Sequence, residues 1–438
     1  MAPRRMRLQK ARVDTSQVGT SGLRQFQGYL REEFLKDLQG QAGSQRYREM
    51  RDNDPVLGAM FNALEFFFIQ TAFPISPAGP DSESQACAQF VRECFDDMDH
   101  TFQDLLSEVM TAPVFGHSEH EIVLKQRMGD NKDVTKRSRF SDGKIGWRRI
   151  ALRKQESIYR WKFNDADPDT AVAFVQQTQT APYFREVPLN RCVHFRMKAD
   201  LGNPEGRSLL RNCHKPYTFL SGLQEIEAIS HERLGCGFPV LPVPPSILDP
   251  DSADSSVATA LLDALSQVRF GERSALLVPA EDGMNGTKTG YGKLEFMRPA
   301  GAASDMNATI LRWESRMAMT LLMDWLTVGN DQSGGSRAMH VDKTSMFSKS
   351  MSWLADRFCT TFTAQAVHPL CRINGFAQRA WPKLTHGPIV PISATDFAAY
   401  VNTMVGAGVL VPGPNIEAAA LAYVDIQPED HAGEMAPG

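Results

Sequence analysis

Hydrophobic residues recur at helical spacing through the first third of the chain. Residues 53–73 are mostly apolar, with Asn53 or Asp54 placed to cap the segment and Pro55 suited to its first turn. Ser82 begins a capping box with Gln85, and Thr101 is placed to cap a further segment. The apolar faces behind these caps are Cys87, Phe90, Val91, Cys94, Phe95 and Met98, and then Phe102, Leu105, Leu106, Val109 and Met110. The pattern predicts three consecutive amphipathic helices.

The periodicity then changes to that of strands. Residues 121–125, 147–154 and 192–197 read as strands, and in the last of them apolar and polar side chains alternate. The polar residues 128–146 lie between the first two strands and suit a hairpin. Helices followed by a mixed sheet predict an α+β fold.

The second half of the chain returns to helices. Residues 215–234 predict a helix whose Phe219, Leu223 and Ile226 share one face. A proline-rich passage then precedes a short helix at 257–268, and two strands are predicted at 274–278 and 294–297. The helix at 305–326 carries a single stripe, formed by Ile310, Trp313, Met317, Leu321 and Trp325.

A glycine-rich loop, VGNDQSGGSRA, follows this helix and leads into another predicted at 344–367, with Leu354, Phe358 and Phe362 aligned. A capped helix is predicted from Thr395, and a last short helix at 416–423. The acidic end beyond it is predicted to be disordered.

Composition narrows the class of protein. The chain has 438 residues, of which 42% are hydrophobic and 22% charged, and its formal net charge is −4. These values exclude a disordered or collagen-like chain and argue against gripping nucleic acid over one large basic face. The length predicts two or three folding units. Seven cysteines without a CxxC pair favour reduced, buried thiols in a cytoplasmic setting.

Membrane insertion and secretion are not expected. The basic N-terminus is followed by no apolar segment, so a signal peptide is not predicted. The most apolar window, residues 56–73, is interrupted by Asn62, Glu65 and Gln70, which indicates a buried helix.

Candidate chemistry is sparse. In GHSEHEIV, His117 and His120 stand at i and i+3 beside Glu121, whereas a zinc-binding helix needs i and i+4. The spacing therefore favours the interpretation that His117, His120 and Glu121 are polar residues of the surface and of a strand near a turn. His194 is interpreted as a satisfied sheet residue, and Asp324 as a surface or interface carboxylate. No nucleophile elbow, phosphate-binding loop or metal-ligand cluster is present, so no catalytic, cofactor or metal residue is predicted.

The order of these segments resembles that of a tailed-bacteriophage portal protein, the head-to-tail connector ring at one vertex of the capsid. The opening YREMRDNDPVLGAMFNALEFFFIQTAFPISP and the strand in GHSEHEIVLK resemble the start of such a chain. The most specific block runs from PLNRCVHFRMKADLGNPEGRSLLRN to the long helix. LEFMRPAG, the stripe helix, GNDQSGGSRA and a second long helix follow in the same order.

The resemblance implies a portal fold with wing, stem, clip and crown regions. The implied regions are a flexible basic arm at 1–21, the wing at 22–212, a first stem helix at 213–235, the clip at 236–300, a second stem helix at 301–326, a tunnel loop at 327–343, a long helix returning to the wing at 344–376, the crown at 377–425 and a disordered tail at 426–438. The helix at 257–268 has no place in this scheme.

The implied function is structural rather than enzymatic. Portals form a homo-oligomeric ring, usually of twelve copies, through which double-stranded DNA is packaged and ejected without sequence specificity. The implied partners are the terminase, the major capsid protein and neck or adaptor proteins, and the implied location is the virion, with host cytoplasm during assembly. The tunnel-loop residues expected to face DNA are Gly329, Asn330, Gly334, Gly335, Arg337 and Lys343.

The charge balance agrees with this expectation, because a strongly basic channel would hold DNA rather than let it slide. Two alternatives stay open. One is another phage connector or capsid-associated ring protein, although head-completion proteins tend to be much smaller. The other is an enzyme with an unrecognised site.

Overall fold

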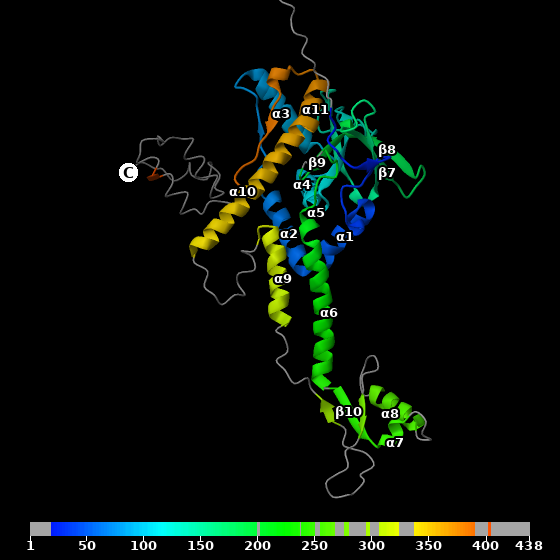
Figure 1. The fold of residues 1–438 in the computed structure, drawn as a ribbon. Coiled ribbons are helices and arrows are strands. Elements are labelled where there is room, and N and C mark those ends of the chain that lie inside the picture. Colours follow the sequence, from blue (N-terminus) through cyan, green and yellow to red (C-terminus); the bar gives the residue numbers. More distant parts are fainter. Residues whose placement is uncertain are drawn as a thin grey trace, which may run out of the picture. The chain divides into compact units, whose positions relative to one another are not determined.

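A computed structural model of the chain describes residues 19–198, 202–236, 238–249, 255–267, 276–279, 295–297, 306–323, 337–389 and 402–403. The chain divides into two compact units (Figure 1). Unit 1 comprises Met1–Ser44, Phe61–Ser208 and Ser336–Gly438, and unit 2 comprises Gln45–Met60 and Leu209–Gly335. Of the helix predicted from Thr395, only residues 402–403 are described, and they are helical. The helix predicted at 416–423 and the N-terminal arm up to residue 18 lie outside the described residues.

The predicted N-terminal helices are present with small shifts. Asp54 caps α2 (Pro55–Ile69), where its Oδ1 accepts hydrogen bonds from the backbone N–H groups of Val56 and Leu57. A preceding helix, α1 (Gly40–Asn53), was not indicated by the pattern. Both α1 and α2 have residues in each unit.

The next helices belong to unit 1. The cap of α3 (Ser82–Asp96) is Asp81 rather than Ser82, because the Asp81 carboxylate accepts the Ser84 N–H. Thr101 caps α4 (Phe102–Val109) in a capping box with Asp104. The short α5 (Thr111–Phe115) ends at Gly116, whose φ of 95° is a left-handed conformation that favours glycine.

Two antiparallel sheets follow in unit 1. The first, ordered β5–β4–β9, contains the three strands predicted from the sequence, and the second, β6–β7–β8, was not predicted. The strands are β4 (His117–Gln126), β5 (Ile145–Arg153), β6 (Ile158–Phe163), β7 (Ala171–Gln177), β8 (Phe184–Pro188) and β9 (Cys192–Arg196). A register shift between Val123 and Leu124 marks a bulge in β4. Two-stranded pairings add β1 (Gln25–Phe26) with β2 (Tyr29–Leu30), and β3 (Ile75–Ser76) with β13 (Lys383–Leu384).

The edge of the first sheet is covered by the C-terminal helical run of unit 1. This run consists of α10 (Arg337–Phe362), a π-helical turn (Thr363–Val367) and α11 (His368–Ile373). The Gln365 side chain accepts the His194 N–H at 2.7 Å, and the Arg357 side chain donates to the Arg196 carbonyl at 2.6 Å. These contacts satisfy backbone groups of β9 that would otherwise be free to pair with another chain.

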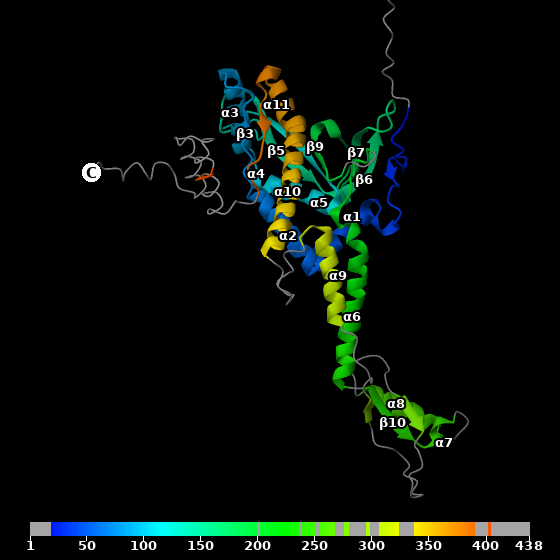
Figure 2. The same cartoon turned by 60° about the vertical axis from the view of Figure 1, so that its left-hand side comes forward.

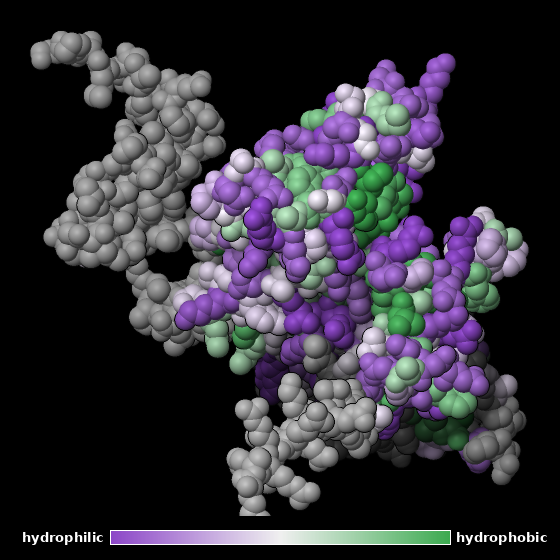
Figure 3. All heavy atoms as spheres, turned by 90° about the horizontal axis from the view of Figure 1, so that it is seen from above, coloured by the Kyte–Doolittle hydropathy of each residue, from purple (hydrophilic) through white to green (hydrophobic). Residues whose placement is uncertain are grey.

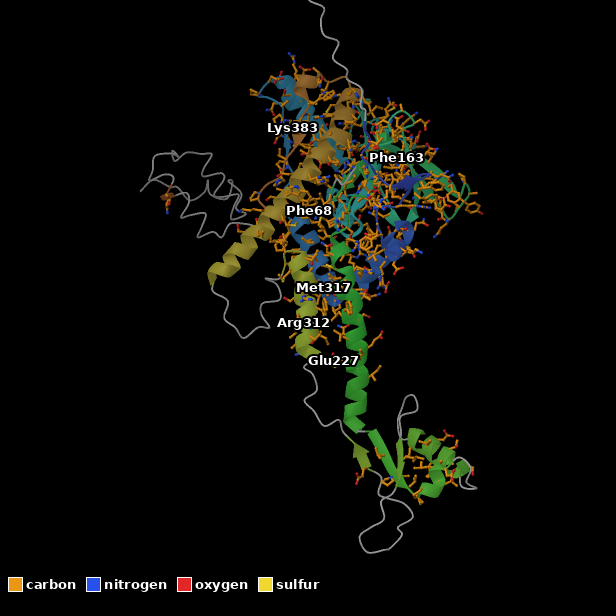
Figure 4. The ribbon with its side chains drawn as sticks, viewed as in Figure 1. Phe68, Phe163, Glu227, Arg312, Met317 and Lys383 are labelled. Atoms are coloured by element: carbon orange, nitrogen blue, oxygen red, sulfur yellow. The ribbon has the colours of Figure 1, made fainter. Side chains whose placement is uncertain are left out.

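An aromatic cluster forms the core of unit 1. Phe358 of α10 packs against the rings of Phe68, Phe73 and Phe195, with centroids 5.1–5.6 Å apart. Figure 4 marks Phe68 on α2. Further rings from α3, α4, β5 and α10 join the cluster, namely Phe95, Phe102, Trp147 and Phe362. This aromatic cluster thus holds together helices and strands that lie far apart in the sequence.

Unit 2 contains a helical pair and a small mixed sheet. The helix α6 (His214–Cys236) runs beside α9 (Met306–Thr320), as Figures 1 and 2 both show. The sheet is ordered β11–β10–β12, with β10 (Phe238–Val243) parallel to β11 (Leu276–Pro279) and antiparallel to β12 (Glu295–Met297).

The helix that had no place in the sequence scheme has one in this sheet. A parallel strand pair needs a crossover, and α7 (Pro245–Leu248) with α8 (Ser255–Gln267) supplies it between β10 and β11. The predicted helix at 257–268 is therefore α8, a crossover helix.

We predict that Phe358→Ala lowers the free energy of unfolding by about 3–5 kcal/mol, because it empties the centre of the aromatic cluster. Phe358 is buried, whereas Phe66 of α2 is 61% exposed and serves as the control. Phe66→Ala should cost less than about 1 kcal/mol. Urea unfolding followed by circular dichroism measures both values, and equal losses would contradict a core centred on Phe358.

Candidate inter-subunit surface and polar cluster

The tunnel-loop residues proposed from the sequence are only partly placed. Gly329, Asn330, Gly334 and Gly335 lie outside the described residues. The helix α10 begins at Arg337, earlier than the predicted start at Thr344, so Arg337 and Lys343 are helical rather than part of a loop. A DNA-facing role for these six residues stays a prediction.

The helical pair of unit 2 packs through one face of each helix. On α9, Ile310, Met317 and Leu321 of the predicted stripe are buried, while Trp313 is half-buried. Figure 4 marks Met317 and Arg312 on α9, and Glu227 on α6. The Trp313 ring stacks on Phe219 of α6, with centroids 5.5 Å apart and planes 7° apart. The stripe predicted for α9 is thus the face that packs within the subunit, as far as Leu321.

The face predicted for α6 behaves differently. Phe219 is 52% exposed and Ile226 is 51% exposed, although both are large apolar side chains. Ile229 is also exposed, and Gly222 lies between them, so the spacing 219, 222, 226, 229 follows one side of the helix. We name these four residues the α6 stripe. It is an apolar seam of coiled-coil spacing that the subunit leaves half exposed: the Phe219 ring stacks on Trp313 with part of its surface, whereas Ile226 and Ile229 remain largely open.

Gly222 is the small residue within the α6 stripe. A Cβ built at Gly222 meets no atom within 4 Å, so packing inside the subunit does not require glycine there. Glycine in a helix interior costs about 0.5–1 kcal/mol relative to alanine. Gly222 therefore lowers the stability of α6, and no contact within the subunit requires a glycine at this position.

A second uncovered stripe lies on α9. Leu311 and Met319 are exposed and, with the small residue Ser315, follow a side of α9 distinct from its buried face. Leu322, just beyond the end of the helix, is exposed as well. We name these four residues the α9 stripe. The two stripes are different surfaces of the same helical pair.

The end of α9 departs from the prediction. The helix was expected to reach residue 326 but ends at Thr320. Leu322 adopts a left-handed φ of 59°, and the Met323 N–H donates to the Ala318 carbonyl at 2.9 Å, which is the capping bond of a Schellman motif. A leucine in this conformation is unusual, and it turns the chain away from the helix axis immediately before residue 324.

The histidines of GHSEHEIV belong to strand β4, as expected, but they are buried rather than on the surface. His117 and Glu119 point to the same side of β4, and the register places His194 of β9 opposite Glu119. His117 Nδ1 lies 2.7 Å from Glu119 Oε1, and His194 Nε2 lies 3.4 Å from the same oxygen. His194 Nε2 also contacts the Pro204 carbonyl at 2.8 Å, so its ring is satisfied.

Burial and charge act differently on the two histidines. Burial opposes the charged form of His117, but the adjacent Glu119 carboxylate outweighs that effect and raises the pKa of His117. Burial lowers the pKa of His194 to about 4, and the charges of Arg196 and His117 add to this effect, which outweighs the opposite effect of Glu119. His117 and Glu119 thus form a buried pair of opposite charges, and His194 beside them is neutral. The contacts of Glu119 with these two histidines join β4 to β9 inside unit 1.

The cluster does not resemble an active site. Trp161 of β6 covers it, with its ring 5.9 Å from that of His117 and 5.6 Å from that of His194. Its indole N–H donates to Glu205. Within the described part of the chain, no three histidine, cysteine or acidic side chains are arranged to hold a metal ion, and no helix is long and apolar enough to span a membrane.

The surface drawn in Figure 3 is mostly hydrophilic, with separate hydrophobic patches. This agrees with the near-neutral, mixed charge of the sequence and shows no extended apolar face in that view.

Comparison with known proteins identifies the family. Residues 44–422 match the family described as the portal protein of Mu bacteriophage. This match covers most of the chain, so the chain belongs to that family of phage portal proteins. No curated protein matches the chain.

Solved structures of a gene transfer agent (GTA) particle share the fold. The virion of the native GTA particle matches with a TM-score of 0.52 and 8% identity over 90% of this chain and 95% of that chain. The neck of the empty particle, computed with C6 symmetry, gives 0.52 and 9% over 90% and 95%. The neck of the native particle, computed with C12 symmetry, gives 0.51 and 10% over 88% and 94%. At these identities the likeness establishes the fold alone.

We predict that Gly222→Ala raises the free energy of unfolding of the dilute subunit by about 0.5–1 kcal/mol, because the new methyl group meets open space. Gly58→Ala in α2 is the matched control, since its Cβ would lie 3.1 Å from the Arg51 carbonyl oxygen and should gain less. Thermal or urea unfolding measures both. A loss at Gly222 would mean that this glycine serves the isolated subunit.

We predict a specific acid sensitivity from His194. Its folded pKa of about 4 lies below the ordinary value near 6.5, so its contribution to stability is complete above pH 6.5 and is lost as pH falls toward 4. Between pH 7.5 and pH 5 the wild type should lose about 2 kcal/mol more than His194→Gln, which does not titrate. The raised pKa of His117 makes its contribution to stability grow as pH falls, and this effect is present in both the wild type and His194→Gln.

Urea unfolding at the two pH values measures this difference. Equal losses in wild type and His194→Gln would show that His194 is not held neutral.

Proposed function

We propose that this chain forms the portal ring of a phage or phage-like particle, a closed ring at one vertex that serves as a channel for double-stranded DNA. The observation that carries the proposal is the uncovered α6 stripe, an apolar seam containing a glycine that the subunit itself does not need. Membership of the portal family and the C12-symmetric neck of the structural neighbour support a ring, with twelve copies as the expected number.

A ring needs two different surfaces that fit each other, because each copy contacts the next through a heterologous interface. The α6 stripe and the α9 stripe provide such a pair on one helical unit. Each presents apolar side chains around a small residue, Gly222 on α6 and Ser315 on α9, which lets backbones approach closely. Burial of one exposed isoleucine at such a contact contributes about 1.5–3 kcal/mol.

The regions implied by the portal resemblance can be assigned within this proposal. The helices α6 and α9 are the stem, and the sheet β11–β10–β12 with α7 and α8 is the clip, which would meet the terminase during packaging and neck or adaptor proteins afterwards. Unit 1 is the wing, whose outer surface would face the major capsid protein. The described chain continues beyond residue 377 as β13 paired with β3 in unit 1, so a crown would begin after this strand.

The charge of the chain suits passage of DNA rather than tight binding. A formal net charge of −4 leaves positive side chains only locally, such as Arg312 and Arg316 exposed on α9. Contacts between DNA phosphates and a few isolated arginines are weak, and they weaken further as the salt concentration rises. We therefore propose non-specific, transient contact with DNA, with the segment 327–343 as the nearest to it, and no catalytic role.

We predict that the double variant Ile226→Asp with Ile229→Asp remains folded but no longer forms rings at micromolar concentration. The aspartates would place charges in an apolar contact, which costs several kcal/mol for each interface. Mass photometry and negative-stain microscopy measure the outcome. The wild type should give a ring of about twelve 48.7-kDa subunits with an open axis.

The control is Ser221→Asp, which adds a charge to an exposed position of α6 outside the stripe and should leave the ring intact. Rings that survive in the double variant would remove the α6 stripe from the interface. A wild type that stays monomeric or dimeric at all concentrations would contradict the ring itself.

A further inference from the structure

Two cysteines far apart in the sequence meet inside unit 1. Cys87 lies on α3 and Cys371 on α11, and their Sγ atoms are 3.4 Å apart. Both side chains are completely buried. The two sulfur atoms are therefore in van der Waals contact, and no other atom separates them.

The surrounding contacts hold the two helices in this position. Phe90 of α3 packs on Phe376, just beyond α11, with centroids 5.4 Å apart. The Asn374 side chain accepts the Ile145 N–H and donates to the Ile145 carbonyl, both at 2.9 Å, which ties the end of α11 to β5. The meeting of the two thiols is thus fixed by packing on both sides.

A positive charge lies beside the pair. The Lys144 ammonium is 4.9 Å from the centre of the Phe90 ring and 5.0 Å from that of Phe376. The hydrogen bond between the two thiols and the Lys144 charge together lower the pKa of the Cys87 thiol, while the pKa of Cys371 is raised. Cys87 is the sulfur that more readily becomes a thiolate.

Cys94, Cys192, Cys213 and Cys359 are also buried, but burial raises the pKa of each of them to about 12. Cys94 is close to Arg127, whose Nη1 lies 3.9 Å from its Sγ, and it makes no described hydrogen bond to another cysteine. Among the cysteines whose side chains the structure describes, Cys87 and Cys371 are therefore distinguished by both position and reactivity.

We propose that Cys87 and Cys371 form an oxidation-dependent cross-link that fastens α11 to α3. The oxidant is a peroxide. The Cys87 thiolate attacks one oxygen of hydrogen peroxide, the O–O bond breaks, and a sulfenic acid forms; the leaving hydroxide takes up the proton that Cys87 released on ionising and becomes water. The Cys371 sulfur then attacks the Cys87 sulfur, the S–O bond breaks, and the second water leaves with the Cys371 proton. Two thiols and one peroxide give one disulfide and two waters.

Access for so small an oxidant requires only local opening, and α11 is a six-residue helix near the end of the described part of unit 1. The cross-link would close the chain between residues 87 and 371 and so restrict its unfolded state. If the protein is made in a reducing cytoplasm and ends in a released particle, as the proposed function implies, the bond would form after assembly. The chemistry itself does not depend on that function.

The test exposes the full-length protein to hydrogen peroxide and compares it with untreated protein. We expect a product lighter by two hydrogen atoms, with two fewer of the seven thiols alkylated after unfolding, and a peptide that links Cys87 to Cys371. The melting temperature should rise by about 5 °C and return when a dithiol reductant is added.

Two variants separate this proposal from general oxidation. Cys371→Ser should stay folded, form no link and accumulate a sulfenic acid at Cys87 that dimedone traps. Cys94→Ser should form the link as the wild type does. A peptide linking Cys94 instead, or oxidation of Cys87 to sulfinic acid in the wild type without a link, would overturn the proposal. Ring formation is scored separately in each sample, so failure of the cross-link does not bear on the ring.

Discussion

Unit 1 depends on the aromatic contacts made by Phe358. This ring lies on a helix late in the sequence, and it packs against residues of α2, α4 and β9 that come much earlier. The same helical run satisfies the edge of β9 through Gln365 and Arg357. The early helices and the first sheet therefore acquire their core and their protected edge only when α10 and the turn that follows it are in place.

Unit 2 follows a different constraint, because its helical pair leaves apolar surface uncovered. The face of α9 that contains Met317 is filled by its neighbours, but Phe219 and Ile226 of α6 remain half exposed. A helix that keeps such residues in water, and a glycine that weakens it, is poorly optimised as a free element. The same features are favourable in a subunit whose helices are completed by neighbouring copies, which is why they support the proposed ring.

The buried polar groups of unit 1 show how one carboxylate serves two strands. Glu119 compensates His117 and leaves His194 to be held neutral by burial and by the Pro204 carbonyl. Such a cluster costs desolvation energy, which the contacts of Glu119 Oε1 offset only in part, because Glu119 Oε2 is buried without a hydrogen-bond partner. It fixes the register of β4 against β9, since a shift by one residue would place Glu119 in the core without a partner.

The sequence alone determined the elements whose signals are local. Spacing and residue type predicted the Thr101 cap, narrowed the cap of α2 to Asn53 or Asp54, and predicted β4, β5 and β9 and the helices α6 and α9. They also gave the order of segments that identifies the portal family. Only the tertiary structure decided that His117 is buried, that α8 is a crossover, that Leu322 ends α9 and that the face of α6 carrying Ile226 is uncovered. Periodicity reports which residues share a face, whereas burial depends on what the rest of the chain places against that face.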